Sequence, residues 1–176
     1  NAKIEKNKHT AIVGMMNSAY SGKDWQSAVS SAAQVAADNR SDKDDVRRAK
    51  YVEAKSLLAT SQREKAFTIL KSLSSETATP EGAEAAYLII QDSYDRGKFE
   101  EVETLVYKLS DSGTNQTYWL AKAFIALGDS FAERGEMKQA KATFESIRDG
   151  YTPEGKADEV LDNVNMRLRK IEERGE

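Results

Sequence analysis

One loop in this 176-residue chain has residues at a spacing that could bind phosphate. The segment from Gly150 to Lys156 matches a phosphate-binding loop, in which backbone amides and a lysine hold the phosphate groups. That chemistry also needs a serine or threonine after the lysine to hold Mg²⁺, and Ala157 stands there. Pro153 removes one of the amides that would contact phosphate. We therefore predict that this segment is a connecting loop and not a nucleotide site.

The other residues with reactive side chains are isolated in the sequence. His9 is the only histidine, and the spacing identifies no carboxylate or hydroxyl partner for it. We expect it to be a surface histidine or one satisfied by its neighbours. The acidic run at Asp42, Asp44 and Asp45 lacks the glycine and the final glutamate of a calcium loop. It is typical of a helix N-terminus, where the helix dipole favours negative charge.

Charge and composition exclude several other classes of site. Lys and Arg number 26 against 29 Asp and Glu, which gives a net charge of −3. We expect the small basic patch of Arg47, Arg48, Lys50 and Lys55 to be a solvated helix face and not a nucleic-acid surface. The absence of cysteine excludes disulfides and thiolate metal sites, and a single histidine excludes a zinc site built on several histidines. The longest apolar stretch, around residues 85–90, is far too short to cross a bilayer.

The elements that position these residues are predicted to be helices throughout. Ala, Glu, Lys, Leu and Gln dominate, apolar residues return every three or four positions, and alternating β-branched runs are nearly absent. Ser41 followed by Asp44 is typical of a helix cap with an acidic first turn, and Pro80 suits a helix start. Glycine and polar clusters divide the chain into nine expected helices. The eight breaks are expected at 21–23, 39–41, 60–62, 77–80, 96–97, 111–113, 134–135 and 150–153.

The expected helices repeat in pairs. After the tight turn inside each pair stands a small residue near the start of the second helix, at Ala28, Ala66, Val102 and Ala140. These positions are 38, 36 and 38 residues apart, so four copies agree in phase. A small side chain at this point lets the second helix approach the first closely.

The last pair resembles a tetratricopeptide repeat. Leu-Gly-Asp-Ser-Phe at 127–131, followed by Gly135, Ala140, Phe144 and Ile147, follows the order of that family's two-helix signature. The other three pairs keep the turn and the small residue but have no Leu-Gly. The resemblance implies an all-α fold: a right-handed superhelical solenoid of four helix pairs with a C-terminal capping helix. We expect a tag remnant at residues 1–2, repeats at about 3–40, 41–79, 80–113 and 114–153, and the cap at 154–176.

A narrower resemblance concerns the end of the last repeat. Tyr151-Thr152-Pro153, a short spacer and Lys156-Ala157 resemble repeats of bacterial envelope proteins. Those include outer-membrane assembly lipoproteins, periplasmic partners of the Tol system and large tandem-repeat proteins of Bacteroidetes; Thr152 is an insertion relative to them. The resemblance favours a periplasmic or outer-membrane-associated location, with the cytoplasm as the alternative.

In the tetratricopeptide family the first helices line the concave face, where ligands usually lie. Projecting that face by helical period places three tyrosines, Tyr51, Tyr87 and Tyr94, at its middle. Tyrosine gives a large contact area, and its hydroxyl tolerates a wet groove, which suits an extended peptide or a partner helix. The alternative is that these tyrosines only pack between adjacent repeats. The expected groove residues are Asn17, Tyr20, Tyr51, Lys55, Tyr87, Gln91, Tyr94 and Asp129.

Two functions remain open from the sequence. The first is a non-catalytic scaffold that binds a protein or an extended peptide, with no catalytic residue, metal or cofactor and no nucleic acid. The second is a structural spacer within a longer repeat array. The carboxylate clamp that some members of the family use is not expected, because Val52 and Leu88 occupy positions that should complete it. Among the core candidates, Met15 and Met16 are both expected to be buried.

Overall fold

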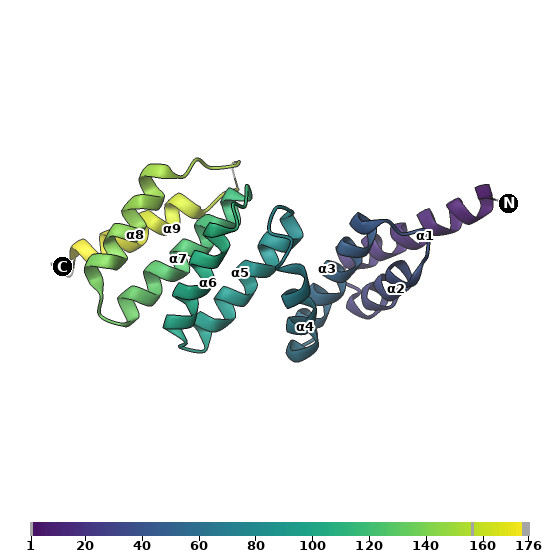
Figure 1. Ribbon diagram of the computed structural model, residues 1–176, viewed down its shortest axis with the longest axis horizontal. Helices are drawn as coiled ribbons and strands as arrows, with labels where there is room; N and C mark the ends of the chain where they lie inside the picture. Colours follow the sequence, from purple (N-terminus) through teal and green to yellow (C-terminus); the bar gives the residue numbers. More distant parts are fainter. Residues whose placement is uncertain (1, 156, 174–176) are drawn as a thin grey trace. The chain divides into compact units, whose positions relative to one another are not determined.

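The structure is a computed structural model that describes residues 2–155 and 157–173, and these residues form nine α-helices and no strand (Figure 1). The expected all-α class is confirmed. The chain divides into two compact units, Asn1–Ser75 and Glu76–Glu176, called here the first unit and the second unit. The expected tag remnant lies partly outside the described residues, and Ala2 begins the first helix. The superhelix of four pairs stays a prediction.

The first unit consists of two antiparallel helix pairs. The helix α1 (Ala2–Ser21) packs against α2 (Trp25–Ala37), and α3 (Lys43–Ala59) packs against α4 (Arg63–Leu73). Both α1 and α2 also contact α3, so the core lies where these three helices meet. That core consists of Met16, Ala28, Ala32, Val35, Ala49 and Val52.

The second unit adds a fifth helix to two pairs. Its helices are α5 (Pro80–Asp95), α6 (Phe99–Asp111), α7 (Thr117–Glu133), α8 (Met137–Gly150) and α9 (Val160–Glu173). The helix α7 contacts α5, α6 and α9 as well as its partner α8, so it lies at the centre of the unit. The core is larger than that of the first unit and includes Ile90, Val102, Val106, Leu127, Phe144, Val164 and Leu168.

The turn inside each helix pair has the same geometry in all four copies. One residue has a left-handed backbone, and the amide after it donates to a carbonyl five residues earlier over 2.8–2.9 Å. This closed C-terminal turn, the Schellman motif, satisfies carbonyls that the helix end leaves open, and it favours glycine. Glycine holds the position only in the second unit. The four left-handed residues are Lys23 (φ 60°), Ser61 (φ 61°), Gly97 (φ 68°) and Gly135 (φ 78°).

The small residues that mark the period are all buried. The side chains of Ala28, Ala66, Val102 and Ala140 have no exposed surface, as close packing of two helices requires. In the last pair Gly128 adds a closer contact, because a Cβ atom built there would overlap the ring of Phe144. The missing side chain at Gly128 thus leaves the space that the ring of Phe144 on the second helix occupies.

The start of α3 has the expected cap and acidic first turn, but the capping residue lies one position later than predicted. Asp42, and not Ser41, caps α3, and its carboxylate accepts the amides of Asp44 at 2.8 Å and Asp45 at 2.9 Å. Ser41 instead donates to the carbonyl of Val35 at 2.6 Å, which closes the end of α2. Two carboxylates three residues apart, at 42 and 45, therefore form a reciprocal capping box.

Two further sequence predictions are wrong in detail. Met15 is 52 % exposed, because its neighbour Met16 occupies the core position on α1. The capping helix is predicted over 154–176, but α9 begins at Val160. The carboxylate of Asp158 accepts the amides of Glu154 and Val160, each at 3.0 Å, and this holds the preceding loop out of a helical conformation.

Candidate functional site

The eight expected groove residues fall into two clusters, one in each unit. In the first unit Tyr20 on α1 lies beside Tyr51 on α3, and Lys55 is close to the Tyr51 ring. Asn17 is on the same helix as Tyr20. In the second unit α5 and α7 supply the other four, Tyr87, Gln91, Tyr94 and Asp129. All eight side chains are half-buried, so packing and ligand contact are both open to them.

In the first unit an arginine lies between the tyrosines. The Arg48 guanidinium carbon is 5.5 Å from the centre of the Tyr20 ring and 5.2 Å from that of Tyr51, and the two rings meet edge to face at 6.3 Å. Arg48 Nε also donates to the Asn17 side-chain oxygen at 3.4 Å, and Lys55 Nζ lies 5.9 Å from the Tyr51 ring. We name Asn17, Tyr20, Arg48, Tyr51 and Lys55 the first-unit face.

The charge of Arg48 is not balanced within this face. Its contacts are an amide oxygen and two aromatic rings, and no described carboxylate forms an ion pair with it. Arg48 belongs to the basic patch that we expected to be a solvated helix face, and it is half-buried between the two rings. By contrast Arg47 pairs with Asp44 at 2.6 Å. The helical spacing could have predicted that Arg48 lies beside Tyr51, because Arg48, Tyr51 and Lys55 share one side of a helix.

In the second unit the expected residues line a cavity of about 330 Å³ between α5, α7 and α9. We name it the second-unit cavity. Its polar lining combines hydroxyl, amide and charged groups, whereas Ile125, Ala126 and Val160 supply its apolar part. The other lining residues are Tyr87, Gln91, Tyr94, Lys122, Asp129, Glu159, Asn163 and Arg167. Sequence reasoning missed all contributions of α9, because they depend on how that helix packs against α7.

The charges of the second-unit cavity are paired with one another. Arg167 forms a fork with Asp129, with both nitrogen–oxygen distances at 2.7 Å. Lys122 Nζ lies 3.3 Å from Glu159, and the hydroxyl of Tyr118 donates to the same carboxylate at 2.9 Å. The fork joins α7 to α9, and the contacts of Glu159 join α7 to the residue just before α9.

The aromatic rings surround the lysine of this network. Lys122 Nζ lies 5.1, 5.2 and 5.6 Å from the ring centres of Tyr87, Tyr118 and Trp119. Burial alone lowers the pKa of Lys122, but Tyr87, Tyr118 and Glu159 raise it overall, so the ammonium stays charged. Burial also raises the pKa of Tyr87 and of Tyr94, which keeps both hydroxyls protonated and able to donate at neutral pH.

One hydroxyl of the cavity lacks a partner. The Tyr94 side chain packs against Phe99 with ring centres 5.8 Å apart, but its hydroxyl forms no hydrogen bond with any described residue. Tyr87 differs, since it donates to Gln91 at 3.2 Å, and Gln91 in turn donates to Asp95 at 2.8 Å. The free donor of Tyr94 is therefore available to a ligand.

A second hollow in the same unit is larger but chemically plainer. It measures about 500 Å³ between α6, α7 and α8, and its described lining residues, among them Leu120, Phe124 and Tyr107, are all uncharged. A binding site needs a few convergent polar groups to orient its ligand. The larger hollow offers only hydroxyls, whereas the smaller second-unit cavity combines hydroxyl, amide and charged groups, so it is the better candidate.

The described residues of the first-unit face and of the second-unit cavity can form hydrogen bonds, ion pairs and aromatic contacts. Within 7–155 and 157–173, no three His, Asp or Glu side chains are grouped so that they could hold a metal ion. None of the described helices combines the length and the apolar character that crossing a bilayer demands. No family model, no curated protein and no solved structure matches this chain.

Proposed function

We propose that this chain is a non-catalytic binding module that holds an extended segment of a partner protein against the first helices of its pairs. The observation that carries the proposal is the second-unit cavity, where three helices direct tyrosine, amide and charged groups at one space of about 330 Å³. Four turns of one geometry and four buried small residues support a tetratricopeptide-like array.

The lining of the cavity suits a neutral stretch of peptide. An extended peptide presents N–H and C=O groups in alternation, and each needs a partner when it leaves water. The Tyr94 hydroxyl can donate to such a carbonyl, and the amide groups of Gln91 and Asn163 lie in the same lining. Because the charged groups of the cavity already pair with one another, a charged ligand group would have to break a pair.

The first-unit face suits an acidic side chain. A guanidinium without an ion pair can form a forked pair with a carboxylate, and the flanking rings of Tyr20 and Tyr51 hold it in place. The proposed partner segment therefore has a neutral part and at least one Asp or Glu, which the two units would contact separately.

The test is binding of the full chain to an array of short random peptides, followed by titration of the peptides that bind. Tyr94→Phe removes one hydroxyl and keeps the ring, so affinity should fall by about 2- to 10-fold, the value of one hydrogen bond. Tyr107→Phe is the matched control, because this tyrosine is 47 % exposed and lines the other hollow. Its affinity should not change.

Three outcomes would count against the proposal. If no peptide binds above background, the chain is better explained as a structural spacer within a repeat array. If Tyr107→Phe weakens binding and Tyr94→Phe does not, the apolar hollow is the binding site. For the first-unit face, Arg48→Gln should weaken only the peptides that contain Asp or Glu, and an equal loss for neutral peptides would contradict the role given to Arg48.

A further inference from the structure

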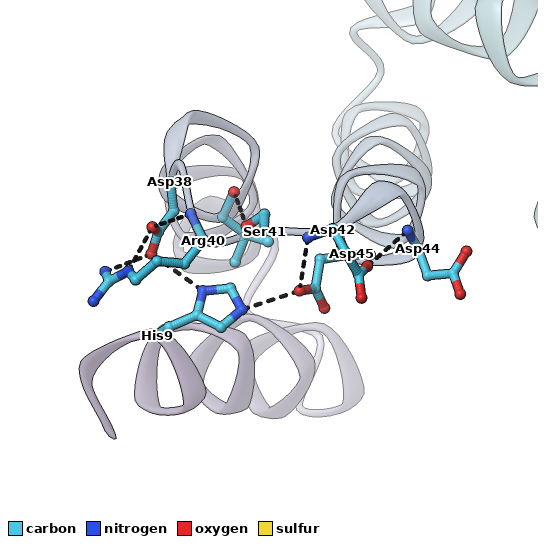
Figure 2. A network of polar contacts seen from close by, with 8 residues as sticks. His9, Asp38, Arg40, Ser41, Asp42, Asp44 and Asp45 are labelled. Carbon is cyan, nitrogen blue, oxygen red and sulfur yellow. Dashed lines mark hydrogen bonds and ion pairs between the residues drawn. The ribbon is translucent and has the colours of Figure 1, made fainter. Parts of the chain in front are cut away.

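The only histidine of the chain lies between two carboxylates in the first unit. Its side chain on α1 is 16 % exposed. Nδ1 lies 3.1 Å from Asp38 Oδ2, and Nε2 lies 3.0 Å from Asp45 Oδ2 (Figure 2). The sequence predicted a surface histidine or one satisfied by its neighbours, and it identified no partner. The structure supplies two, from residues 29 and 36 positions away.

Both carboxylates also accept hydrogen bonds from groups other than His9. Arg40 donates to Asp38 through Nε at 2.7 Å, through Nη2 at 2.6 Å and through its backbone amide at 3.0 Å. Asp45 Oδ2 accepts the amide of Asp42 at 3.4 Å as part of the capping box of α3. The carboxylates are therefore placed by the end of α2 and the start of α3, independently of His9.

A carboxylate at each ring nitrogen favours the doubly protonated form of His9. A neutral imidazole has one N–H, and its other nitrogen presents a lone pair. A lone pair aimed at an ionised carboxylate is repulsive, so only the imidazolium can donate to both partners. The charged groups that face the ring are Asp38 from the end of α2 and Asp45 from α3, with Arg40 beyond Asp38.

We propose that His9 is a proton-dependent clasp that fixes α1 to the connection between α2 and α3. When the ring is protonated, it bridges three elements of the first unit. When the ring loses its proton, one of the two bridges is lost and the freed lone pair faces a carboxylate. The clasp is a property of the first unit alone and does not depend on whether a peptide binds.

The sign of the pH effect follows from the folded and unfolded pKa values. Hydrogen bonds to Asp38 and then Asp45 raise the pKa of His9 above its ordinary 6.5. The stabilisation is therefore fully present below pH 6.5 and is lost as pH rises through the higher folded pKa. Hydrogen bonds from Arg40 hold the pKa of Asp38 well below its usual range, so this carboxylate stays ionised in mild acid.

The first experiment is an NMR titration, which is unambiguous because the chain has one histidine. The ¹⁵N shifts of the ring distinguish the imidazolium from either neutral tautomer. We expect both nitrogens of the full chain to be protonated in mild acid, and the folded pKa to exceed that measured in urea. Asp45→Asn should lower the folded pKa, since the amide keeps an oxygen for the Asp42 backbone but no longer attracts the proton. A folded pKa equal to or below the unfolded one would overturn the proposal.

The second experiment separates the clasp from simple packing. Urea midpoints of the first unit are measured from acid to alkaline pH in the wild type and in His9→Gln, which can hydrogen-bond but cannot titrate. The wild type should lose stability relative to His9→Gln as pH rises above 6.5. Parallel pH profiles would show that the ring only fills space, and the clasp would be refuted.

Discussion

Exchange of the left-handed turn residues between the two units should move stability in opposite directions. Ser61 closes the turn between α3 and α4 at φ 61°, and Gly97 closes the turn between α5 and α6 at φ 68°. The two backbones are thus nearly the same, but one has a side chain and the other does not. We therefore compare Ser61→Gly with Gly97→Ser.

The expected magnitude follows from two opposing terms. A left-handed conformation costs an L-residue about 1–2 kcal/mol, a cost that glycine avoids. Glycine loses roughly 0.5–1 kcal/mol more conformational entropy on folding, which offsets part of the gain. Ser61→Gly should stabilise the first unit by about 0.5–1 kcal/mol, and Gly97→Ser should destabilise the second by a similar amount. A Cβ at Gly97 meets nothing within 4 Å, so no steric clash contributes.

Each unit has its own optical probe for the assay. The chain has two tryptophans, Trp25 in the first unit and Trp119 in the second. Urea unfolding followed by fluorescence in a Trp119→Phe background reports on the first unit, and a Trp25→Phe background reports on the second. Ser61→Ala is the control, because it removes the hydroxyl but keeps the left-handed strain, and it should leave stability nearly unchanged. A loss of stability in Ser61→Gly, or no change in Gly97→Ser, would refute the explanation from backbone strain.

Two further changes test the packing of the second unit. Gly128→Ala should destabilise it by about 1–3 kcal/mol in urea unfolding, because the new methyl group overlaps Phe144; Phe144→Leu in the same chain should recover part of this loss. Arg167→Lys keeps the charge but loses the fork to Asp129, and it should cost about 0.5–1.5 kcal/mol. A double-mutant cycle with Asp129→Asn measures this coupling, and a coupling energy near zero would mean that solvent already screens the pair.

Local signals in the sequence were sufficient to predict where the helices begin and end. All eight breaks were predicted within a few residues, because glycine, proline and cap residues act on the backbone next to them. The regular spacing of small residues also located the buried contact between the helices of each pair, at Ala28 and its three counterparts. The turn at Ser61 was found from polar composition, although its left-handed residue is not a glycine.

The candidate site was predicted only in part, because its remaining members come from distant positions. The pattern along a helix places Tyr87, Gln91 and Tyr94 on one side of α5. It does not reveal that α9 completes the cavity with Asn163 and Arg167. The partners of His9 were missed for the same reason, since they become neighbours only when α1 packs beside the connection between α2 and α3.

The different pairing of charge in the two units has a consequence for their response to dissolved salt. Mobile ions screen a charge over a Debye length of about 8 Å at physiological ionic strength. Arg48 has no ion-pair partner among the described residues, so its attraction for an anion from solution would be open to this screening. Arg167 and Asp129 touch at 2.7 Å, so counterions cannot enter between them. Added salt should therefore weaken an ionic contact at the first-unit face much more than the ion pair inside the second-unit cavity.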